Sequence, residues 1–188
     1  MKFIIEHLEL RVYKWCFLEY KHISKIVGKQ NVIFTNVKNA KDQEKLKPFG
    51  KVDKRSVAEL SLKNCCVLDP KAKKTLNPKE AKKFDYFIFG GILGDHPPKE
   101  RTKVLLTSRM KNSDVRNLGD KQFPTDNAVL VVKKIIEGKN LKEIRFADNI
   151  ELEIKEGESV VIPYRYVFEN GPVIFDELIE FIKKSGRF

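Results

Sequence analysis

Two stretches decide the fold: FDYFIFGGILGDHPP at residues 84–98 and LGDKQFPTDNA at residues 118–128. In each region an apolar run typical of a β-strand gives way to a tight polar loop that contains glycine. CCVLDP at residues 65–70 also ends a buried, strand-like run in a polar turn. Ligands of open α/β sheets bind beyond the carboxyl ends of the strands. Three such loops on neighbouring strands therefore predict one shared pocket.

Glycines dominate these loops, and they let the backbone take positive φ angles and approach a ligand closely. The alternative is that each glycine is an ordinary turn residue, and for any single glycine that alternative is the stronger one. GGxxG at residues 90–94 differs from the GxGxxG of dinucleotide sites, and GxxxxGK[ST] is absent. The loops therefore predict a pocket without identifying a standard nucleotide site.

The chain alternates between segments with strand and helix patterns. This order predicts the α/β class with a mostly parallel sheet. Residues 125–137 are apolar nearly all round, so this helix should be enclosed. Residues 38–56 should form a loop with a short helix. The pattern of residues 57–62 does not distinguish a helix from a strand. The expected strands are 2–6, 31–35, 65–68, 84–89, 115–118, 145–155 and 157–167, and the expected helices are 14–28, 77–82, 99–108, 125–137 and 175–184.

Length and composition bound the class of protein. With 188 residues, 41% of them hydrophobic, we expect a single domain over 1–188, with 145–188 as a small C-terminal extension. No apolar run approaches the roughly 20 residues of a membrane span, and charges interrupt the N-terminal apolar run, so no signal peptide is predicted. The three cysteines lack a CxxC spacing and there are only three histidines. We therefore expect no metal site and a reducing, cytoplasmic location.

The net charge of +11 is unevenly distributed. Residues 1–83 hold 20 Lys or Arg against 9 Asp or Glu, whereas residues 84–188 hold 17 of each. One interpretation is a basic face that meets RNA or a ribonucleoprotein. The other is a solvated, lysine-rich surface of the kind found in thermophile proteins. Both interpretations stay open on the sequence.

Further short motifs accompany the two stretches in a fixed order along the chain. Together they resemble a SPOUT-class family of S-adenosylmethionine-dependent methyltransferases, which includes archaeal predicted RNA methyltransferases and a eukaryotic ribosomal-protein arginine methyltransferase. The similarity covers nearly the whole chain and is loosest over residues 36–64. The accompanying motifs are IIEH at 4–7, LEY at 18–20, LDP at 68–70, RT at 101–102, TD at 125–126 and RYV at 165–167.

This resemblance implies a C-terminal trefoil knot, which periodicity alone does not predict because knots are almost absent from proteins. It also implies S-adenosylmethionine as the cofactor, held by the three loops. On that basis Gly91→Val should abolish cofactor binding and leave the fold intact. The residues expected to contact the cofactor are Leu68, Asp69, Gly90, Gly91, Leu93, Gly94, Leu118, Gly119, Gln122 and Thr125.

Methyl transfer requires alignment of donor and acceptor, and positioning of this kind is worth roughly 7–11 kcal/mol. An arginine acceptor stays charged, so a carboxylate must orient it and help its proton leave. The candidates in the matching segments are Asp95, then Glu6, with Glu19 and Asp120 after them. The structural alternatives are a helix cap for Asp95 and salt bridges with lysines for Glu6 and Glu19.

The resemblance favours an arginine side chain of a ribosomal protein as the methyl acceptor, and it implies association with the ribosome. An RNA base or ribose, in rRNA or tRNA, is the first alternative, which the basic N-terminal half supports. A non-catalytic RNA-binding module is the second, although a pure binder has no need of a cofactor pocket. No membrane association is expected, and the family resemblance allows a monomer or a homodimer.

Overall fold

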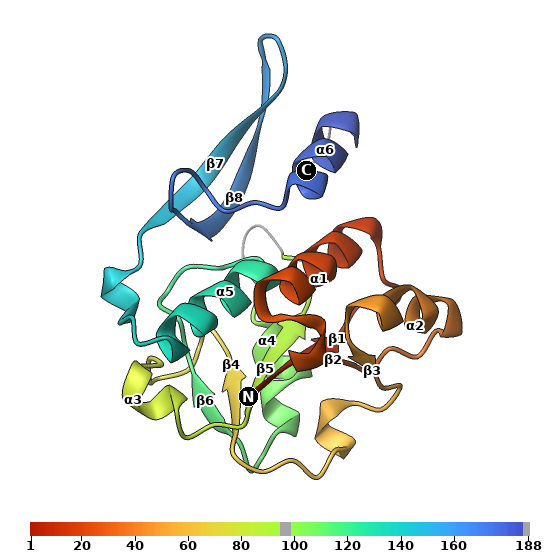
Figure 1. Cartoon of the computed structure of the whole chain (residues 1–188), viewed down its shortest axis with the longest axis vertical. Helices are drawn as coiled ribbons and strands as arrows, with labels where there is room; N and C mark the ends of the chain where they lie inside the picture. The colour runs from red at the N-terminus through yellow and green to blue at the C-terminus, as the bar shows by residue number, and fades with distance from the viewer. Residues whose placement is uncertain (95–98, 186–188) are drawn as a thin grey trace.

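The computed structural model describes residues 1–94 and 99–185 (Figure 1). Its centre is a six-stranded sheet with the strand order β3-β2-β1-β5-β4-β6, in which every pair of neighbours is parallel. The α/β class with a mostly parallel sheet is thus confirmed. The strands are β1 (Lys2–His7), β2 (Val32–Thr35), β3 (Lys51–Val52), β4 (Cys65–Leu68), β5 (Tyr86–Gly91) and β6 (Asp114–Arg116), and the helices between them are α1 (Lys14–Val27), α2 (Ala40–Leu46), α3 (Pro78–Ala81), α4 (Arg101–Leu105) and α5 (Thr125–Ile136).

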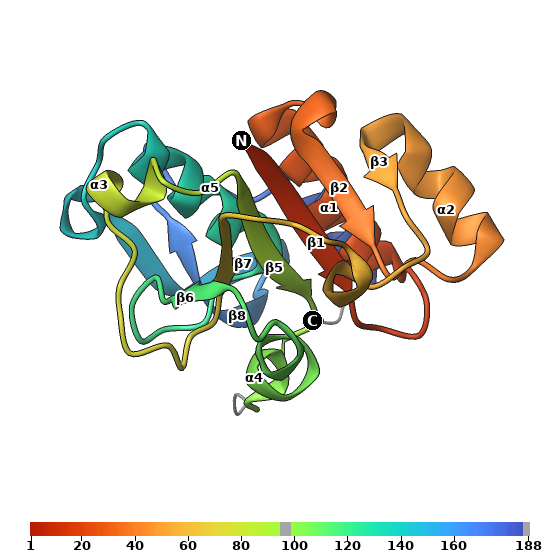
Figure 2. The ribbon, with the colours of Figure 1, turned by 90° about the horizontal axis from the view of Figure 1, so that it is seen from below.

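Helices cover both faces of this sheet because its central strands are apolar on both faces. On one face, Phe3 and Ile5 of β1 belong to the cluster that includes α1 and α5. On the other face, Ile4 and Ile88 pack with Leu106, which directly follows α4. Figure 2 shows α4 on the side of the sheet away from α1. The carboxyl ends of β4 and β5 are left open between these layers, and the predicted loops lie there.

The chain that follows β6 passes through the loop that joins β4 to α3. On one side of it, the Asp69 N–H donates to the Arg116 carbonyl at 3.0 Å. On the other side, the Asn117 N–H donates to the Lys74 carbonyl at 2.8 Å, and the Leu76 N–H donates to the Asn117 carbonyl at 3.0 Å. Both arms of the loop are therefore bonded to this segment, as the trefoil knot implied by the resemblance would require. Every residue of α5, which follows, is at least partly buried, as its apolar pattern predicts.

The C-terminal part forms a second, two-stranded antiparallel sheet from β7 (Phe146–Lys155) and β8 (Glu158–Val167). This hairpin projects away from the main sheet, and α6 (Asp176–Ser185) lies beside it (Figure 1). Tyr166 of β8 and Leu178 of α6 share one buried cluster with Leu18 of α1, which attaches the hairpin to the rest of the chain. Within residues 1–94 and 99–185, no helix is long and apolar enough to cross a membrane.

Four local differences from the sequence predictions have identifiable causes. β5 continues through Gly90 and Gly91, because β1 extends beside it and pairs with both glycines. The two-residue strand β3 was not expected, since so short an edge strand has no period. Residues 57–62 begin with one 3-10 turn, η3 (Val57–Glu59), whose start is capped by Ser56. Thr125 is the first residue of α5 rather than its cap, a position that Pro124 holds.

Candidate active site

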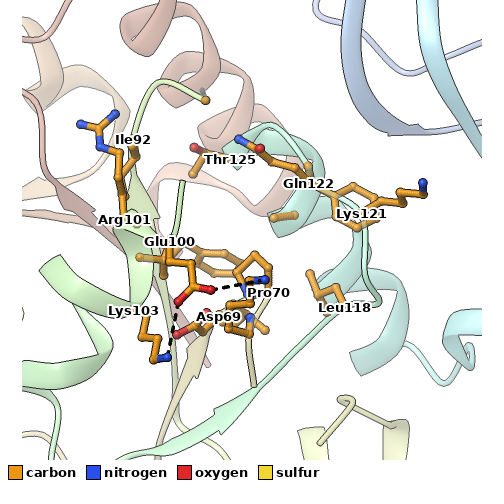
Figure 3. A pocket seen from close by; sticks show the side chains of 18 of the residues that line it. Asp69, Pro70, Ile92, Glu100, Arg101, Lys103, Leu118, Lys121, Gln122 and Thr125 are labelled. Carbon is orange, nitrogen blue, oxygen red and sulfur yellow. Dashed lines mark hydrogen bonds and ion pairs between the residues drawn. The ribbon is translucent and has the colours of Figure 1, made fainter. Parts of the chain in front are cut away.

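A cavity of about 380 Å³ opens at the carboxyl ends of β4 and β5 (Figure 3). The loops after β4, β5 and β6 all contribute to it, so the shared pocket predicted from the three loops exists. Asp120 also lines the cavity. Glu100 lies in the cavity wall, where it forms ion pairs with Lys71 and Lys103. Of the ten predicted cofactor residues, those that line the cavity are Leu68, Asp69, Gly90, Leu93, Gly94, Leu118, Gly119, Gln122 and Thr125.

The loop after β5 is held in place by a carboxylate from the loop after β1. Glu9 Oε1 accepts a hydrogen bond from the Leu93 N–H at 3.0 Å and forms an ion pair with Arg101 at 2.9 Å. Arg101 also donates to the Leu93 carbonyl at 3.1 Å. These bonds hold Leu93 through both its N–H and its carbonyl, so contacts within the protein shape this wall of the cavity.

Asp69 shapes the loop after β4 rather than presenting its carboxylate to the cavity. Oδ1 accepts from the Lys71 N–H at 2.8 Å, and Oδ2 accepts from the Thr107 hydroxyl at 2.6 Å. The first bond closes a local turn of the kind that Asp favours, and the second ties the turn to the segment after α4. A ligand would therefore meet the backbone of this loop more than the Asp69 carboxylate.

The loop after β6 supplies features that suit a polar, nucleoside-like ligand. Gly119 has a φ of 98°, which favours glycine at this position. Gln122 Oε1 is buried without a hydrogen-bond partner among the described residues. A side chain at Gly94 would collide with Gln122 Nε2, only 2.6 Å from the position of a Cβ. An unpaired amide oxygen and glycine-lined walls are what a ligand with N–H donors and a flat ring needs.

Gly91 does not line the cavity, so the prediction that Gly91→Val would block cofactor binding selectively has to be revised. Successive residues of a strand point to opposite faces of the sheet, and a side chain at position 91 would point toward α1. A Cβ there would collide with the Tyr20 hydroxyl and approach Ile5 Cγ2 to 3.1 Å. Tyr20 is buried and bonded to His7 Nδ1 at 2.9 Å, so it has little freedom to move.

Gly91→Val should therefore destabilise the protein instead of closing the cavity. Overpacking of this kind typically costs about 1–3 kcal/mol of unfolding free energy. Chemical denaturation of the variant and the wild-type protein measures the difference. A variant with unchanged stability and lost affinity for S-adenosylhomocysteine would return Gly91 to the cofactor site.

Three of the four predicted catalytic carboxylates, Glu6, Glu19 and Asp120, lie within the described residues. Asp95 lies outside the described residues. Asp120 is at the cavity, but its side chain is 86% exposed and lies 4.0 Å from Arg165. Glu6 is 1% exposed and fully engaged, with Oε2 accepting from the Val57 N–H at 2.9 Å and Oε1 from the Ser56 hydroxyl at 2.5 Å. Glu6 thus holds η3 against the sheet through neutral donors, a structural role that differs from the salt bridge with lysines weighed against catalysis.

Glu19 is different, because it is buried directly behind the cavity. Its carboxylate accepts from Trp15 Nε1 at 2.7 Å, and the nearby polar groups of Thr125, which lines the cavity and begins α5, act to lower its pKa. Burial and the nearby Asp126 carboxylate raise the pKa of Glu19 from 4.5 to about 8. Two buried carboxylates side by side form a site whose ionised state is stabilised by a bound cation.

Sequence reasoning missed Asp126, although the TD motif drew attention to its position. Asp126 Oδ2 lies 2.7 Å from His22 Nδ1, and Asp126 Oδ1 accepts from the Asn127 N–H at 2.7 Å. The Tyr166 hydroxyl is buried in the same region without a partner among the described residues, and burial, followed by the charges of Asp126 and Glu19, raises its pKa. The available signal was the spacing of Trp15, Glu19 and His22, which places them on one face of a helix.

Metal ligation has no support in the part of the chain that the structure describes, since no group of three or more His, Cys, Asp or Glu side chains is arranged to hold an ion. The buried cysteines do not change this picture. Burial raises the pKa of Cys16 and of Cys66 to about 12, so both thiols are protonated at neutral pH.

Comparison with known proteins agrees with this geometry. Residues 2–187 match the model of the family described as protein arginine N-methyltransferase SFM1-like. The chain is 36% identical over 204 residues to protein arginine N-methyltransferase SFM1 of Saccharomyces cerevisiae, covering 99% of this chain and 96% of that protein. The crystal structure of the yeast arginine methyltransferase SFM1 complexed with SAM is similar with a TM-score of 0.89 and 36% identity, over 98% of this chain and 90% of that one.

A more distant likeness supports the fold alone. The crystal structure of a dual-specific Trm10 from Thermococcus kodakaraensis matches with a TM-score of 0.58 and 19% identity, over 76% of this chain and 96% of that chain. The SPOUT-class architecture implied by the sequence motifs is therefore confirmed. With a family model that spans nearly the whole chain, this protein belongs to the SFM1-like family of protein arginine N-methyltransferases.

Proposed function

We propose that this methyltransferase transfers a methyl group to an arginine side chain of a ribosomal protein. S-adenosylmethionine is the cofactor of the family, and the yeast relative is an arginine methyltransferase whose structure was solved with it. The observation that carries the arginine proposal is the buried Glu19–Asp126 pair behind Thr125. The finer claim of a ribosomal acceptor rests on the basic surface described below.

A guanidinium group is the acceptor that fits this pair best. Arginine keeps its charge at any ordinary pH, and its planar fork donates two parallel hydrogen bonds to a carboxylate. Glu19 and Asp126 repel one another in a buried environment, and a bound cation relieves that repulsion. An RNA base or ribose brings no positive charge and would leave the repulsion in place.

The residues of this chain then have distinct tasks in the reaction. Bound S-adenosylmethionine supplies an electrophilic methyl group. Glu19, positioned by Trp15 and Thr125, orients the acceptor nitrogen toward the cavity and takes up its proton. Glu9 and Arg101 keep the 92–94 loop closed on the cavity wall. Positioning of this kind supplies most of the acceleration that methyl transfer needs.

Lysines at one edge of the main sheet support a ribosomal partner. Residues 38–55 contain 7 Lys or Arg against 3 Asp or Glu, and Asp42 is buried. The cationic side chains are exposed on and around α2 and β3. Such a surface favours binding to the phosphate backbone of RNA. A protein acceptor that already sits on RNA would present its arginine to an enzyme held in this way.

The test is the fate of a radiolabelled methyl group. The protein is incubated with labelled S-adenosylmethionine and isolated ribosomal subunits, and the product is digested with RNase or with protease. Label that survives RNase, is lost on proteolysis and elutes as methylarginine after acid hydrolysis is the expected result. Label that is lost to RNase and survives protease would instead establish the RNA methyltransferase alternative and reject the arginine proposal.

A further inference from the structure

One histidine links the buried acidic pair to the surface. His22 Nδ1 lies 2.7 Å from Asp126 Oδ2, and the Asp126 side chain is 1% exposed whereas that of His22 is 13% exposed. His22 belongs to α1 and follows Glu19 by three residues, so both side chains lie on the helix face that packs on α5. A proton placed on the acidic pair can thus reach solvent through a single imidazole ring.

Aromatic stacking fixes the orientation of that ring. The His22 ring lies parallel to the ring of Phe175, with 5.0 Å between centroids and 5° between planes. Rotation of the imidazole would break this stack and the bond to Asp126 together. One ring nitrogen therefore stays directed at the carboxylate, while the other is the only nitrogen through which the ring can pass a proton outward.

Charged side chains flank the His22 ring on both its outer and its inner side. On α1 itself, Lys25 Nζ lies 4.6 Å from the Phe175 centroid, and Lys21 lies 5.9 Å from it. On α6, Glu177 forms an ion pair with Lys21 at 2.6 Å, which reduces the field of that lysine. On the inner side, Glu19 of α1, Asp126 of α5 and the Tyr166 hydroxyl of β8 face the other end of the path. The His22 ring therefore stands between carboxylates on its inner side and lysines on its outer side.

Arginine methylation requires such an exit. As the bond from the acceptor nitrogen to the methyl carbon forms, the carbon–sulfur bond breaks and its electron pair stays on sulfur. The guanidinium has then gained a methyl group, and it must lose one proton to return to a single positive charge. We propose that this proton leaves through Glu19 and Asp126 to His22, and from His22 to solvent, which makes His22 and Asp126 positioning residues for proton release. This proposal rests on arginine as the acceptor.

The test compares the wild-type protein with His22→Asn. The amide nitrogen of asparagine falls near the place of imidazole Nδ1, so it keeps the bond to Asp126 but does not titrate. We expect kcat to fall on the order of 10- to 100-fold, with KM for the acceptor and the affinity for S-adenosylhomocysteine unchanged. Added imidazole should restore part of the rate. Lys29→Gln, at an exposed position just beyond the end of α1, is the control and should keep the wild-type kcat.

A second readout is the dependence of kcat on pH. The profile of the wild-type protein should have a limb that is missing from the profile of His22→Asn. Unchanged kcat in the variant, or a limb that persists, would overturn the proposal. These outcomes are separate from failure of the proposed function, in which the wild-type protein itself would label RNA and no arginine.

Discussion

The Glu19→Gln variant should be more stable than the wild-type protein at pH 9, and yet methylate its acceptor at least about 100-fold more slowly. Both effects have one cause, which is the buried position of this carboxylate beside Asp126. A carboxamide keeps the size of the side chain and can still accept from Trp15. It has no charge to hold a guanidinium and no basic oxygen to receive a proton.

The sign of the stability effect follows from the raised pKa of Glu19. The group ionises near 4.5 in the unfolded chain and near 8 in the folded protein. Between these values the unfolded state releases the proton first, so rising pH favours unfolding, and the loss is complete above about pH 8. Removing the ionisable group should recover on the order of 1–3 kcal/mol at pH 9 and almost nothing at pH 4.

Urea denaturation of both proteins at pH 4, 7 and 9 measures this difference, and single-turnover methylation measures the loss of rate. Glu44→Gln is the matched control, because Glu44 is exposed and pairs with Lys47 at the surface. It should change neither quantity. A Glu19→Gln variant that is destabilised at pH 9, or one that keeps full activity, would remove Glu19 from the acceptor site.

The Gly94→Val variant should lose cofactor affinity by about 10- to 100-fold, which corresponds to the 1–3 kcal/mol typical of overpacking. A Cβ at this position would meet Gln122 Nε2 at 2.6 Å and collide with the Tyr164 hydroxyl. Both Gly94 and Gln122 line the cavity, so the displaced side chains would occupy the space of the ligand. Gly94 lies in a loop outside the packed core, and the fold should tolerate the change.

Calorimetry with S-adenosylhomocysteine gives the affinity, and thermal unfolding without ligand gives the stability. Gly171→Val is the matched control, since nothing lies within 4 Å of the position of its Cβ. It should bind as the wild-type protein does. Wild-type affinity in Gly94→Val would show that the cofactor does not occupy the cavity between the 92–94 and 118–122 loops.

Local patterns in the sequence were sufficient for the strands and for the pocket. Cys65–Leu68 has the bounds expected from its apolar run, and Asn77 caps α3 as the NPKE pattern predicts. The three loops could be assigned to one pocket because parallel strands share one carboxyl edge. The contacts of Asp69 and Asn117 could not be derived in this way. They depend on how segments distant in the sequence are arranged in space, which the periodicity of hydrophobic residues does not encode.

The roles of the site residues show what local sequence patterns cannot predict. Gly90 and Gly91 were treated as one feature, although the alternation of a strand allows only one of them to face the cavity. Glu6 and Glu19 are both buried carboxylates, but only their partners distinguish them. Glu6 meets the neutral donors of η3, whereas Glu19 meets Asp126 across the contact between α1 and α5. That contact joins residues more than 100 positions apart, which no local pattern encodes.

The most direct measurement is a crystal structure of the protein with S-adenosylhomocysteine and an arginine peptide. We predict that the nucleoside occupies the cavity lined by Gly94, Gln122 and Leu118, with its sulfur toward Thr125. The guanidinium should lie between Glu19 and Asp126, on the far side of that sulfur. A guanidinium bound away from these two carboxylates, or a nucleoside outside the cavity, would contradict the account.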